Sequence, residues 1–336
     1  MKKASLRRIE LFIFLYCLLL SVLLIVGNTR IKMNFSGDYV QSALLNEKYK
    51  AGINKIKINF PDGYEFLFDK KKNISNDYEW MCSAGGITFS ADNDTITKML
   101  EVFCTTRNFI QLSDDFSNWN QFDLTDEQAV KVSFYESANG NDTLRSSLFF
   151  GRNTSDYSGV YVRNDRKPTV YRVEDNVSSY LTDNANFWAD LSVVGENTAQ
   201  EAEKSFMSVS ISLNGDSKEN VTKTIKLYND GSESFSSYIH TLLSLRGSGI
   251  VSVKELLLNE PSESPALSHV ATITVEKQDG KSVSLQVFSY APYTPDETVY
   301  TRYFVSNRPN DTQSYPDYFI EISSWTYRNL LPSGLM

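Results

Sequence analysis

The sequence predicts an α+β protein: an N-terminal transmembrane helix followed by two tandem repeats, each a mostly antiparallel sheet with one long helix packed on it. Three observations support this fold class. An apolar run lies near the N-terminus, Phe and Tyr dominate an aromatic content of 13%, and one order of helix, hairpin and strands recurs after about 140 to 150 residues. The 336 residues therefore divide into a stub and anchor (1–30), a first repeat (31–194) and a second repeat (195–336).

The anchor prediction rests on the apolar run from Leu11 to Val26, which follows four Lys or Arg residues among the first eight. Its length suits a single membrane span when the flanking residues extend it. The positive charge places the N-terminus inside and the bulk of the chain outside the cytoplasmic membrane. A cleaved signal peptide is the main alternative, although no small-residue cleavage site follows Val26, and a buried core helix is another.

The predicted anchor region and the remainder of the chain also differ in net charge. Residues 1–30 carry a net charge of +4, which leaves −12 for the remainder of a chain with a formal net charge of −8. Nucleic acid binding depends on cations that neutralise phosphates, so the acidic remainder argues against a nucleic acid partner and against general adhesion to anionic lipid.

The first half contains two hairpin strands, a third strand with Trp80, one long helix and several later strands. The helix is expected to begin at Asp92 or Asp94 and to end near Asn108. A linker containing Trp119 follows it, and four strands and a short terminal helix complete the half. The apolar stripe of the long helix has helical spacing and consists of Ile96, Met99, Leu100, Phe103 and Cys104.

The second half repeats this order with a different sequence. Two strands precede a helix, and a hairpin about Asp279-Gly280, two further strands and a terminal helix follow. The stripe of this second helix, expected in SESFSSYIHTLLSLRGSG (232–249), has the same spacing and consists of Phe235, Tyr238, Ile239, Leu242 and Leu243.

The stretch SLFFGRNTSDYSGVYVRN (147–164) is interpreted as two strands joined by a turn. A phosphate loop would require Gly-Lys-Ser/Thr at the start of a helix, whereas a strand follows here. Gly151 and Gly159 are expected to supply positive φ angles in the connection. Aligning the halves places Tyr161 opposite Tyr303.

Two cysteines follow the predicted anchor, Cys82 and Cys104. Both are expected to face the core, where either a disulfide between strand and helix or two buried thiols would satisfy the pattern. The chain has no CxxC motif, which argues against redox chemistry and a zinc site.

Other chemistry finds little support in the sequence. The two histidines, His240 and His269, are far apart and are expected to have packing or surface roles. The acidic pairs lie in expected loops. We therefore predict no catalytic residue, no metal and no cofactor.

The segments 79–103 and 147–181 resemble a family of domains of unknown function (family 4340). Its members are bacterial membrane-anchored proteins that often lie beside gliding-motility-type ABC transporter components. The resemblance spans residues 53–190, and the second half resembles the family more weakly. The matching positions are Trp80 in its strand, Asp92 at the helix start, the Gly151 turn, the strand with Tyr161, and Val170-Tyr171.

The resemblance implies a location in the cytoplasmic membrane of a bacterium. It also implies a non-enzymatic extracytoplasmic accessory subunit that joins a transporter-type membrane complex. The alternative is a module that binds a small molecule or an envelope polymer in a cleft between the repeats, with tryptophans such as Trp119, Trp188 and Trp325. An envelope hydrolase or a sensor of a membrane kinase are weaker alternatives.

Overall fold

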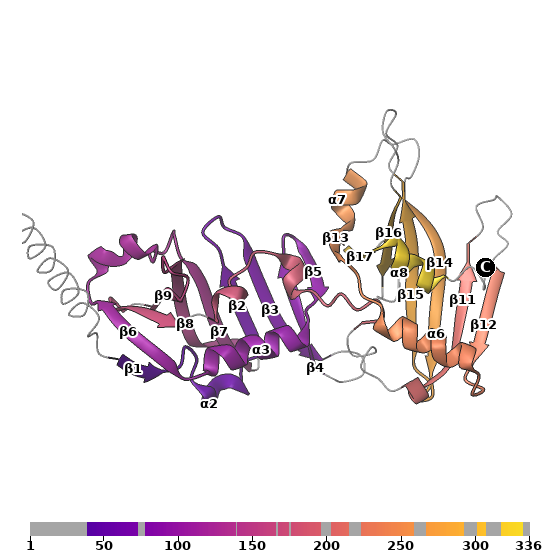
Figure 1. Ribbon diagram of the computed structural model, residues 1–336, viewed down its shortest axis with the longest axis horizontal. Coiled ribbons are helices and arrows are strands. Elements are labelled where there is room, and N and C mark those ends of the chain that lie inside the picture. Colours follow the sequence, from indigo (N-terminus) through magenta and orange to yellow (C-terminus); the bar gives the residue numbers. More distant parts are fainter. Residues whose placement is uncertain are drawn as a thin grey trace, which may run out of the picture.

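The chain folds into an elongated molecule in which two antiparallel sheets follow one another (Figure 1). The computed structural model describes residues 39–72, 78–138, 140–165, 167–174, 176–195, 203–214, 223–258, 267–291, 301–306 and 317–331. Within these ranges, ten strands form the first sheet and seven form the second.

The strands of the first sheet lie side by side in the order β1-β6-β10-β9-β8-β7-β2-β3-β4-β5. In chain order, they are β1 (Tyr39–Ser42), β2 (Lys55–Asn59), β3 (Glu65–Lys72), β4 (Tyr78–Ala84), β5 (Ile87–Ser90), β6 (Arg107–Ser113), β7 (Val130–Ala138), β8 (Asn141–Asn153), β9 (Gly159–Asn164) and β10 (Val170–Glu174).

The strands of the second sheet lie in the order β12-β11-β14-β15-β16-β17-β13. In chain order, they are β11 (Phe206–Leu213), β12 (Lys223–Tyr228), β13 (Gly249–Ser252), β14 (Leu267–Lys277), β15 (Ser282–Tyr290), β16 (Arg302–Ser306) and β17 (Tyr318–Ile322).

The helices are short apart from two of 12 residues each, α3 and α6. In chain order, the helices are α2 (Glu47–Lys50), α3 (Asn93–Cys104), η1 (Phe116–Phe122), η2 (Ser178–Tyr180), α4 (Ala185–Trp188), η3 (Glu203–Ser205), α6 (Glu233–Ser244), α7 (Val253–Leu258) and α8 (Ser324–Leu330). We call the first sheet with the helices α2 to α4 the first unit, and the second sheet with η3 to α8 the second unit.

Helix α3 forms where its capping residue and apolar stripe predict it. The Asp92 carboxylate accepts a hydrogen bond from the Thr95 N–H at 2.8 Å, which satisfies one of the free donors of the first turn. All five residues of the predicted stripe are buried, and α3 lies across one face of the first sheet (Figure 1). Ser232 caps α6 in the same way. Both helices are confirmed, but α3 ends at Cys104 rather than near Asn108, and Leu243 of the second stripe is only partly buried.

Alternating side chains fix the register of the strands beneath α3. In β2, Ile56 and Ile58 are buried while their neighbours are partly exposed. They lie opposite Phe68 and Phe66 of β3, which are also fully buried. A shift of one residue would turn this apolar face to solvent, so the core specifies the pairing.

The predicted fold class is wrong. The chain is a sheet-rich protein built from two large antiparallel sheets rather than from repeats organised around packed helices. Strand β6 lies where the sequence predicts the end of a helix and a linker, β1 and β13 lie where it predicts no strand, and all three widen the sheets. Their pairing partners are distant in sequence, so no local pattern announces them.

The predicted membrane anchor, and with it the single-pass location, is corrected as well. No helix within the described ranges is long and apolar enough to cross a membrane. The run from Leu11 to Val26, on which the prediction depends, lies outside the described residues.

Seven neighbouring strands of the two sheets share one spatial order. The order β6-β10-β9-β8-β7-β2-β3 in the first sheet corresponds to β13-β17-β16-β15-β14-β11-β12 in the second. Each long helix precedes the first strand of this shared order, α3 before β6 and α6 before β13. Strands at the same place in this order are called equivalent below. The predicted boundary between 194 and 195 falls between the two sheets.

Both sheets also bury apolar side chains on the face away from the long helix. In the first unit, Leu124, Ala129, Phe149 and Val170 form a small cluster packed against Trp119 and Phe122 of η1. In the second unit, the equivalent face carries a cluster that includes Val253 and Leu256 of α7. Each sheet is therefore covered over part of its second face as well.

One extended segment, residues 189–194, joins the units, and we call it the connector. Its Asp190 N–H donates to Ser90 O of β5 at 2.8 Å, while Leu191 O accepts from the Gly247 N–H at 2.8 Å. The connector thus pairs with the end of the first sheet and then with the chain that enters β13. Backbone hydrogen bonds on both sides hold the two sheets in one arrangement.

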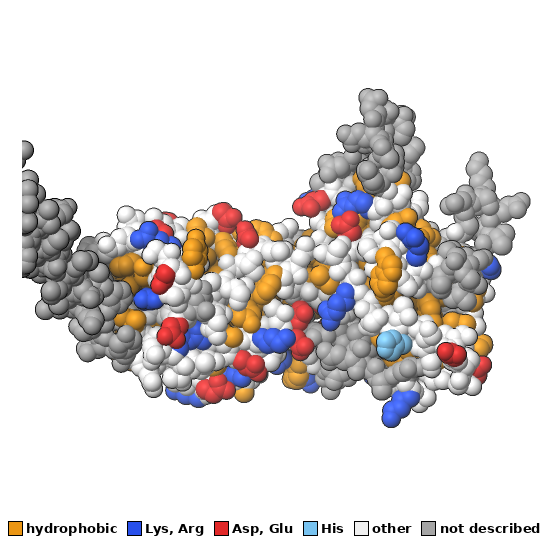
Figure 2. Space-filling model, in the orientation of Figure 1, with side chains coloured by type: hydrophobic (Ala, Val, Ile, Leu, Met, Phe, Trp, Pro, Cys, Tyr) orange, Lys and Arg blue, Asp and Glu red, His pale blue; other side chains and the backbone are white. Residues whose placement is uncertain are grey.

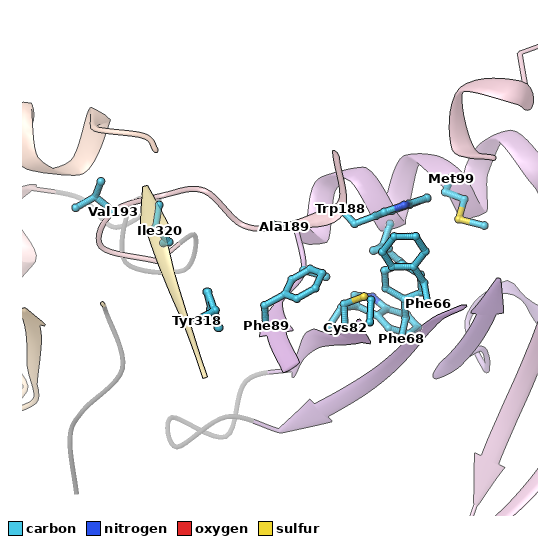
Figure 3. Packing of buried hydrophobic residues seen from close by; sticks show 14 of the residues in the cluster. Phe66, Phe68, Cys82, Phe89, Met99, Trp188, Ala189, Val193, Tyr318 and Ile320 are labelled. Carbon is cyan, nitrogen blue, oxygen red and sulfur yellow. The ribbon is translucent and has the colours of Figure 1, made fainter. Parts of the chain in front are cut away.

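Side chains pack beside the connector at a contact that we call the joint (Figure 3). Phe89 of β5 lies beside Tyr318 of β17, with ring centroids 6.2 Å apart, and the backbone N–H of Ser90 donates to Tyr318 Oη at 3.4 Å. Asn186 Oδ1 accepts from the Ile250 N–H at 2.8 Å. Phe89 is fully buried, and full burial of such a side chain contributes about 1.5 to 3 kcal/mol to folding.

Gly151 lies in β8 where the chain after η1 crosses over the strand. A Cβ at this position would lie 2.0 Å from Phe122 O and 3.1 Å from Asp123 O. Its φ angle is not positive, in contrast to the expectation. The residue is glycine because the backbone of the crossing segment occupies the space of a side chain.

We predict that Gly151→Ala lowers the free energy of unfolding of the first unit by about 1 to 3 kcal/mol, because η1 must move away from the sheet. Urea denaturation followed by tryptophan fluorescence would measure this. Thr143→Ala, at an exposed position of the same strand, is the control and should change stability much less. Equal stability of the two variants would contradict the steric explanation.

Candidate functional site

An apolar groove of about 200 Å³ lies on the helix-side face of the first sheet. Its floor comes from four strands, with Phe109 of β6, Tyr171 of β10, Val162 of β9 and Leu148 of β8. The rings of Phe109 and Tyr171 meet edge to face, 5.6 Å between centroids. The full lining is Val40, Ser42, Ala43, Leu44, Phe109, Leu148, Val162, Arg163, Asn164, Lys167 and Tyr171.

The groove exists because strand alternation places apolar residues on one face beyond the reach of α3. Val162 is fully buried and Tyr171, its partner in the β9–β10 register, is half-buried. The chain from Val40 to Leu44 forms one wall, and Val40 is 48% exposed. Lys167 is an exposed cation at the rim. An apolar floor with a polar edge resembles the anatomy of protein interfaces.

A polar cavity of about 460 Å³ adjoins the same end of the sheet, lined by Gln41, Thr105, Thr106, Arg107, Asn108, Glu174 and Asn176. Arg107 shapes it. This nearly buried side chain donates to Asn176 Oδ1 at 2.8 Å and to Val102 O of α3. A cation is favourable at the C-terminal end of a helix, where carbonyl oxygens lack partners. Arg107 thus ties β6 to the helix and to the chain after β10.

A second buried arginine, Arg163 of β9, points to the opposite face of the sheet. Its guanidinium lies between two rings, 3.7 Å from the centroid of Trp119 and 3.6 Å from that of Phe149. Nε–H donates to Leu124 O at 2.7 Å, and a terminal nitrogen pairs with Asp126. Burial lowers the pKa of Arg163, which Asp126 opposes. These contacts attach η1 and the loop after it to the sheet.

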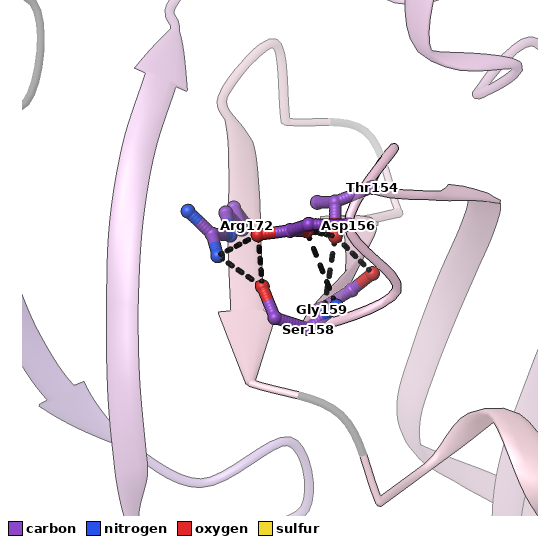
Figure 4. Close-up of polar contacts among 5 residues, drawn as sticks. All are labelled: Thr154, Asp156, Ser158, Gly159 and Arg172. Atoms are coloured by element: carbon purple, nitrogen blue, oxygen red, sulfur yellow. Dashed lines mark hydrogen bonds and ion pairs between the residues drawn. The ribbon is translucent and has the colours of Figure 1, made fainter.

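The turn between β8 and β9 confirms the interpretation of 147–164 (Figure 4). Asp156 accepts hydrogen bonds from the hydroxyls of Thr154 and Ser158 at 2.5 and 2.8 Å. These bonds hold the pKa of the Asp156 carboxyl well below its usual range. Tyr157, with φ of 54° and 79% exposure, supplies the positive φ expected of glycine. The residues form a closed turn, and a strand follows it.

The other residues named in the resemblance and in the alignment of the halves lie in separate places. Trp80 is buried in β4 beneath the start of α3, and its backbone N–H donates to Asn93 Oδ1 at 3.0 Å. Asp92 caps α3. The ring of Tyr161 meets that of Phe122 of η1 edge to face, with centroids 4.9 Å apart. The ring of Tyr303 stacks on that of Tyr327 of α8, with centroids 4.0 Å apart. The structure does not bring these residues together.

Tyr161 and Tyr303 therefore lie on opposite faces of their sheets. Tyr161 packs with the cluster beneath η1, whereas Tyr303 packs against the main core beside α8. Phe304, in the cluster beneath α7, lies on the face equivalent to that of Tyr161. The proposed alignment of the halves is thus displaced by one residue, which in a strand reverses the side chain.

Cys82 and Cys104 are both buried free thiols. Cys82 lies in β4 on the same side as Trp80, and Cys104 ends the stripe of α3, so both face the core as predicted. Burial raises the pKa of Cys82, and burial together with Glu47 raises the pKa of Cys104 to about 11. Neither thiol is activated as a nucleophile.

The tryptophans expected to line a ligand cleft between the repeats are also dispersed. Trp119 covers Arg163, Trp188 is fully buried against Phe66 and Phe68, and Trp325 is 66% exposed on α8. Neither of the two cavities described above lies at the joint. In the described ranges, no group of three or more His, Cys, Asp or Glu residues could hold a metal ion.

The sequence does not predict the groove. Tyr171 belongs to a position that carries the family resemblance and is expected in a strand, whereas the segment with Phe109 is expected in a linker. The four floor residues come from strands that are distant in the chain, so only sheet pairing brings them together.

Charged side chains of both signs are interspersed on the face of the molecule shown in Figure 2. They form no extended patch of one sign there. Contacts at this face would therefore depend on shape and local hydrogen bonds more than on a general electrostatic field.

Comparison with known proteins identifies one family. The model described as Domain of unknown function (DUF4340) matches residues 84–263, more than half of the chain. The matched span runs from the end of β4 to beyond α7, further along the chain than the expected 53–190. It includes both long helices, the connector and Phe89 of the joint, but not Tyr318. No curated protein and no solved structure matches the chain.

We predict that Arg163→Lys lowers the free energy of unfolding of the first unit by about 2 to 3 kcal/mol. Lysine cannot stack between the rings and also donate to Leu124 O, so a buried carbonyl loses its partner. Chemical denaturation would test this, with Arg152→Lys, an exposed arginine of neighbouring β8, as the control. If both variants were equally stable, the buried stack would have no structural role.

A second prediction concerns pH. His269 Nδ1 lies 2.7 Å from Asn214 Nδ2, and Nε2 lies 3.0 Å from Ala271 O, which fits a neutral ring protonated on Nε2. Burial lowers the pKa of His269. Between the lowered pKa and the ordinary value near 6.5, the unfolded chain binds more protons. This contribution to stability is therefore complete above about pH 6.5 and is lost as the pH falls from there through the lowered pKa.

We expect thermal unfolding measured from pH 7.5 to 5 to show this decline. His269→Gln should flatten it, whereas His240→Gln, at an exposed position of α6, should leave it intact. An unchanged slope in His269→Gln would show that other groups cause the decline.

Proposed function

The chain belongs to the family Domain of unknown function (DUF4340), and we propose that it is a non-enzymatic accessory subunit that binds protein components of a bacterial, gliding-motility-type ABC transporter complex. The observation that carries the binding role is the apolar groove beside the polar cavity at the open end of the first sheet. The choice of a transporter rests on the family resemblance.

The polar side chains with the strongest interactions favour a structural over a catalytic role. Arg107 and Arg163 are engaged with backbone carbonyls, and Asp156 is engaged within its own turn. A catalytic acid, base or nucleophile needs a pKa matched to its task and access to a substrate. The lowered pKa of Asp156 and the raised pKa values of the cysteines move these groups away from such a role.

The connector supports the same proposal, because an accessory subunit must hold its contact surfaces in a fixed arrangement. Backbone hydrogen bonds and the packing of Phe89 against Tyr318 join the units. The alternative, a ligand site in a cleft between the units, has less support because side chains fill the joint and the two cavities lie elsewhere.

We expect the tagged full-length chain, crosslinked in cells and purified gently, to recover a transporter permease and its ATPase at a constant ratio. Mass spectrometry of the purified material would measure this. A tagged unrelated protein of similar abundance is the control. Recovery of the chain alone would count against the accessory-subunit proposal.

A further inference from the structure

The second sheet ends at β12, whereas the equivalent strand of the first sheet, β3, lies inside its sheet (Figure 1). Strand β3 pairs with β4 on its outer side over residues 67–72. In the part of the chain that the structure describes, no strand pairs with the outer side of β12. The strand order that the units share thus continues for two more strands in the first unit and stops at β12 in the second.

The difference comes from one hairpin in the chain of the first unit. Strands β4 and β5 lie between β3 and α3, whereas only residues 229–232 lead from β12 to α6. So short a segment has no room for a turn and a further strand. The chain that follows β12 therefore supplies no equivalent of β4.

The helix-side face of both strands carries apolar residues at alternate positions. In β3 these are Phe66 and Phe68, both fully buried, and in β12 they are Ile225 and Leu227, both half-buried. Cys82 of β4 lies opposite Phe68 on the outer side of β3. The inner neighbours, all in the main core, are Ile58 and Ile56 of β2 and Ile211 and Val209 of β11. The apolar residues of β12 thus keep the exposure that β4 and the helix side remove in β3.

Backbone groups of β12 also face its outer side. The Asn229 N–H donates to Met207 O of β11 at 2.9 Å. Because the bonding side alternates with each residue of an antiparallel strand, Leu227 also bonds to β11, while Thr224 and Lys226 direct their N–H and C=O groups outward. A strand added at such an edge gains affinity from main-chain hydrogen bonds and specificity from alternate side chains.

Charge indicates which kind of strand fits. Strand β12 contains Lys223 and Lys226 and no acidic residue. Lys226 contacts Glu276 at 3.5 Å, and 37% of its side chain is exposed. A second copy of β12 would bring two more lysines to this edge, which like charges disfavour, whereas a carboxylate beside Lys226 would be attracted. The first unit has a pair of this kind, because Lys71 of β3 lies opposite Glu79 of β4.

We infer that the outer side of β12 binds one strand of a partner protein, antiparallel to β12 as β4 is to β3. The strand carries apolar residues beside Ile225 and Leu227 and an acidic residue between them, beside Lys226. This adds a contact surface at the far end of the second sheet, and it does not depend on which complex the chain joins.

The test places the photoreactive residue p-benzoylphenylalanine at position 228 of the tagged full-length chain, and at position 157 of a control chain. Tyr228 is 56% exposed in β12, and Tyr157 is 79% exposed in the turn between β8 and β9. After irradiation in cells, mass spectrometry locates the attached residue. We expect position 228 to attach to one protein, in a segment where apolar residues alternate with an acidic residue, and position 157 not to attach to that protein.

A proline tests the backbone contact. Thr224→Pro removes an outward N–H, which an edge strand tolerates, whereas Thr224→Ala loses the same side chain and keeps the N–H. In the chain with the photoreactive residue, we expect the proline to lower the yield of the adduct about tenfold, the loss of roughly one hydrogen bond, and the alanine to leave it nearly unchanged.

Unchanged circular dichroism and melting establish that the variants fold. If Thr224→Pro does not fold, Lys226→Glu takes its place, because it repels the acidic residue of the partner, and an unchanged yield with it would overturn the inference. So would no adduct at position 228, an adduct in a segment without the alternation, an adduct with this chain or a second copy of it, or equal yields from Thr224→Pro and Thr224→Ala.

This inference and the proposed function fail in different ways. Transporter proteins recovered with the wild-type chain, together with no adduct at position 228, would leave the proposed function standing and overturn the inference. An adduct with such a strand in a protein outside any transporter, lost in Thr224→Pro, would support the inference and count against the proposed function.

Discussion

The backbone pairing of the connector is the interaction on which the arrangement of this protein depends. Residues 189–194 bond first to the end of the first sheet and then to the chain entering β13. The N–H and C=O groups of an extended segment need partners when they are buried, and the two sheet ends supply them. Phe89 and Tyr318 then close the contact with apolar surface.

The same requirement explains why the joint and the groove both lie at sheet ends. The end strand of a sheet leaves part of its face and one edge uncovered, and proteins cover, pair or modify such ends. In the second unit, the first unit covers the end that begins with β13. In the first unit, the entering chain covers part of the equivalent end, and the groove with Phe109 and Tyr171 lies beside it.

Sequence patterns predicted the elements whose signals are local. The stripe of α3, its cap at Asp92 and the turn before β9 are each determined by residues a few positions apart. The short strands β1, β6 and β13 gave no such signal, because their stability comes from pairing with distant strands. The alignment of Tyr161 with Tyr303 failed for a related reason, since a strand reverses its faces with each residue.

The sequence by itself determined the capped helices, the alternating strands, the closed turn and the burial of Cys82 and Cys104, since periodicity and capping act over one or two turns of chain. Tertiary structure alone decided that the strands form two large sheets with a common order, that a connector fixes them, and that Gly151 is needed for close approach rather than for a positive φ. It also created the groove, because strands as far apart in the chain as β1 and β10 meet there only through sheet pairing.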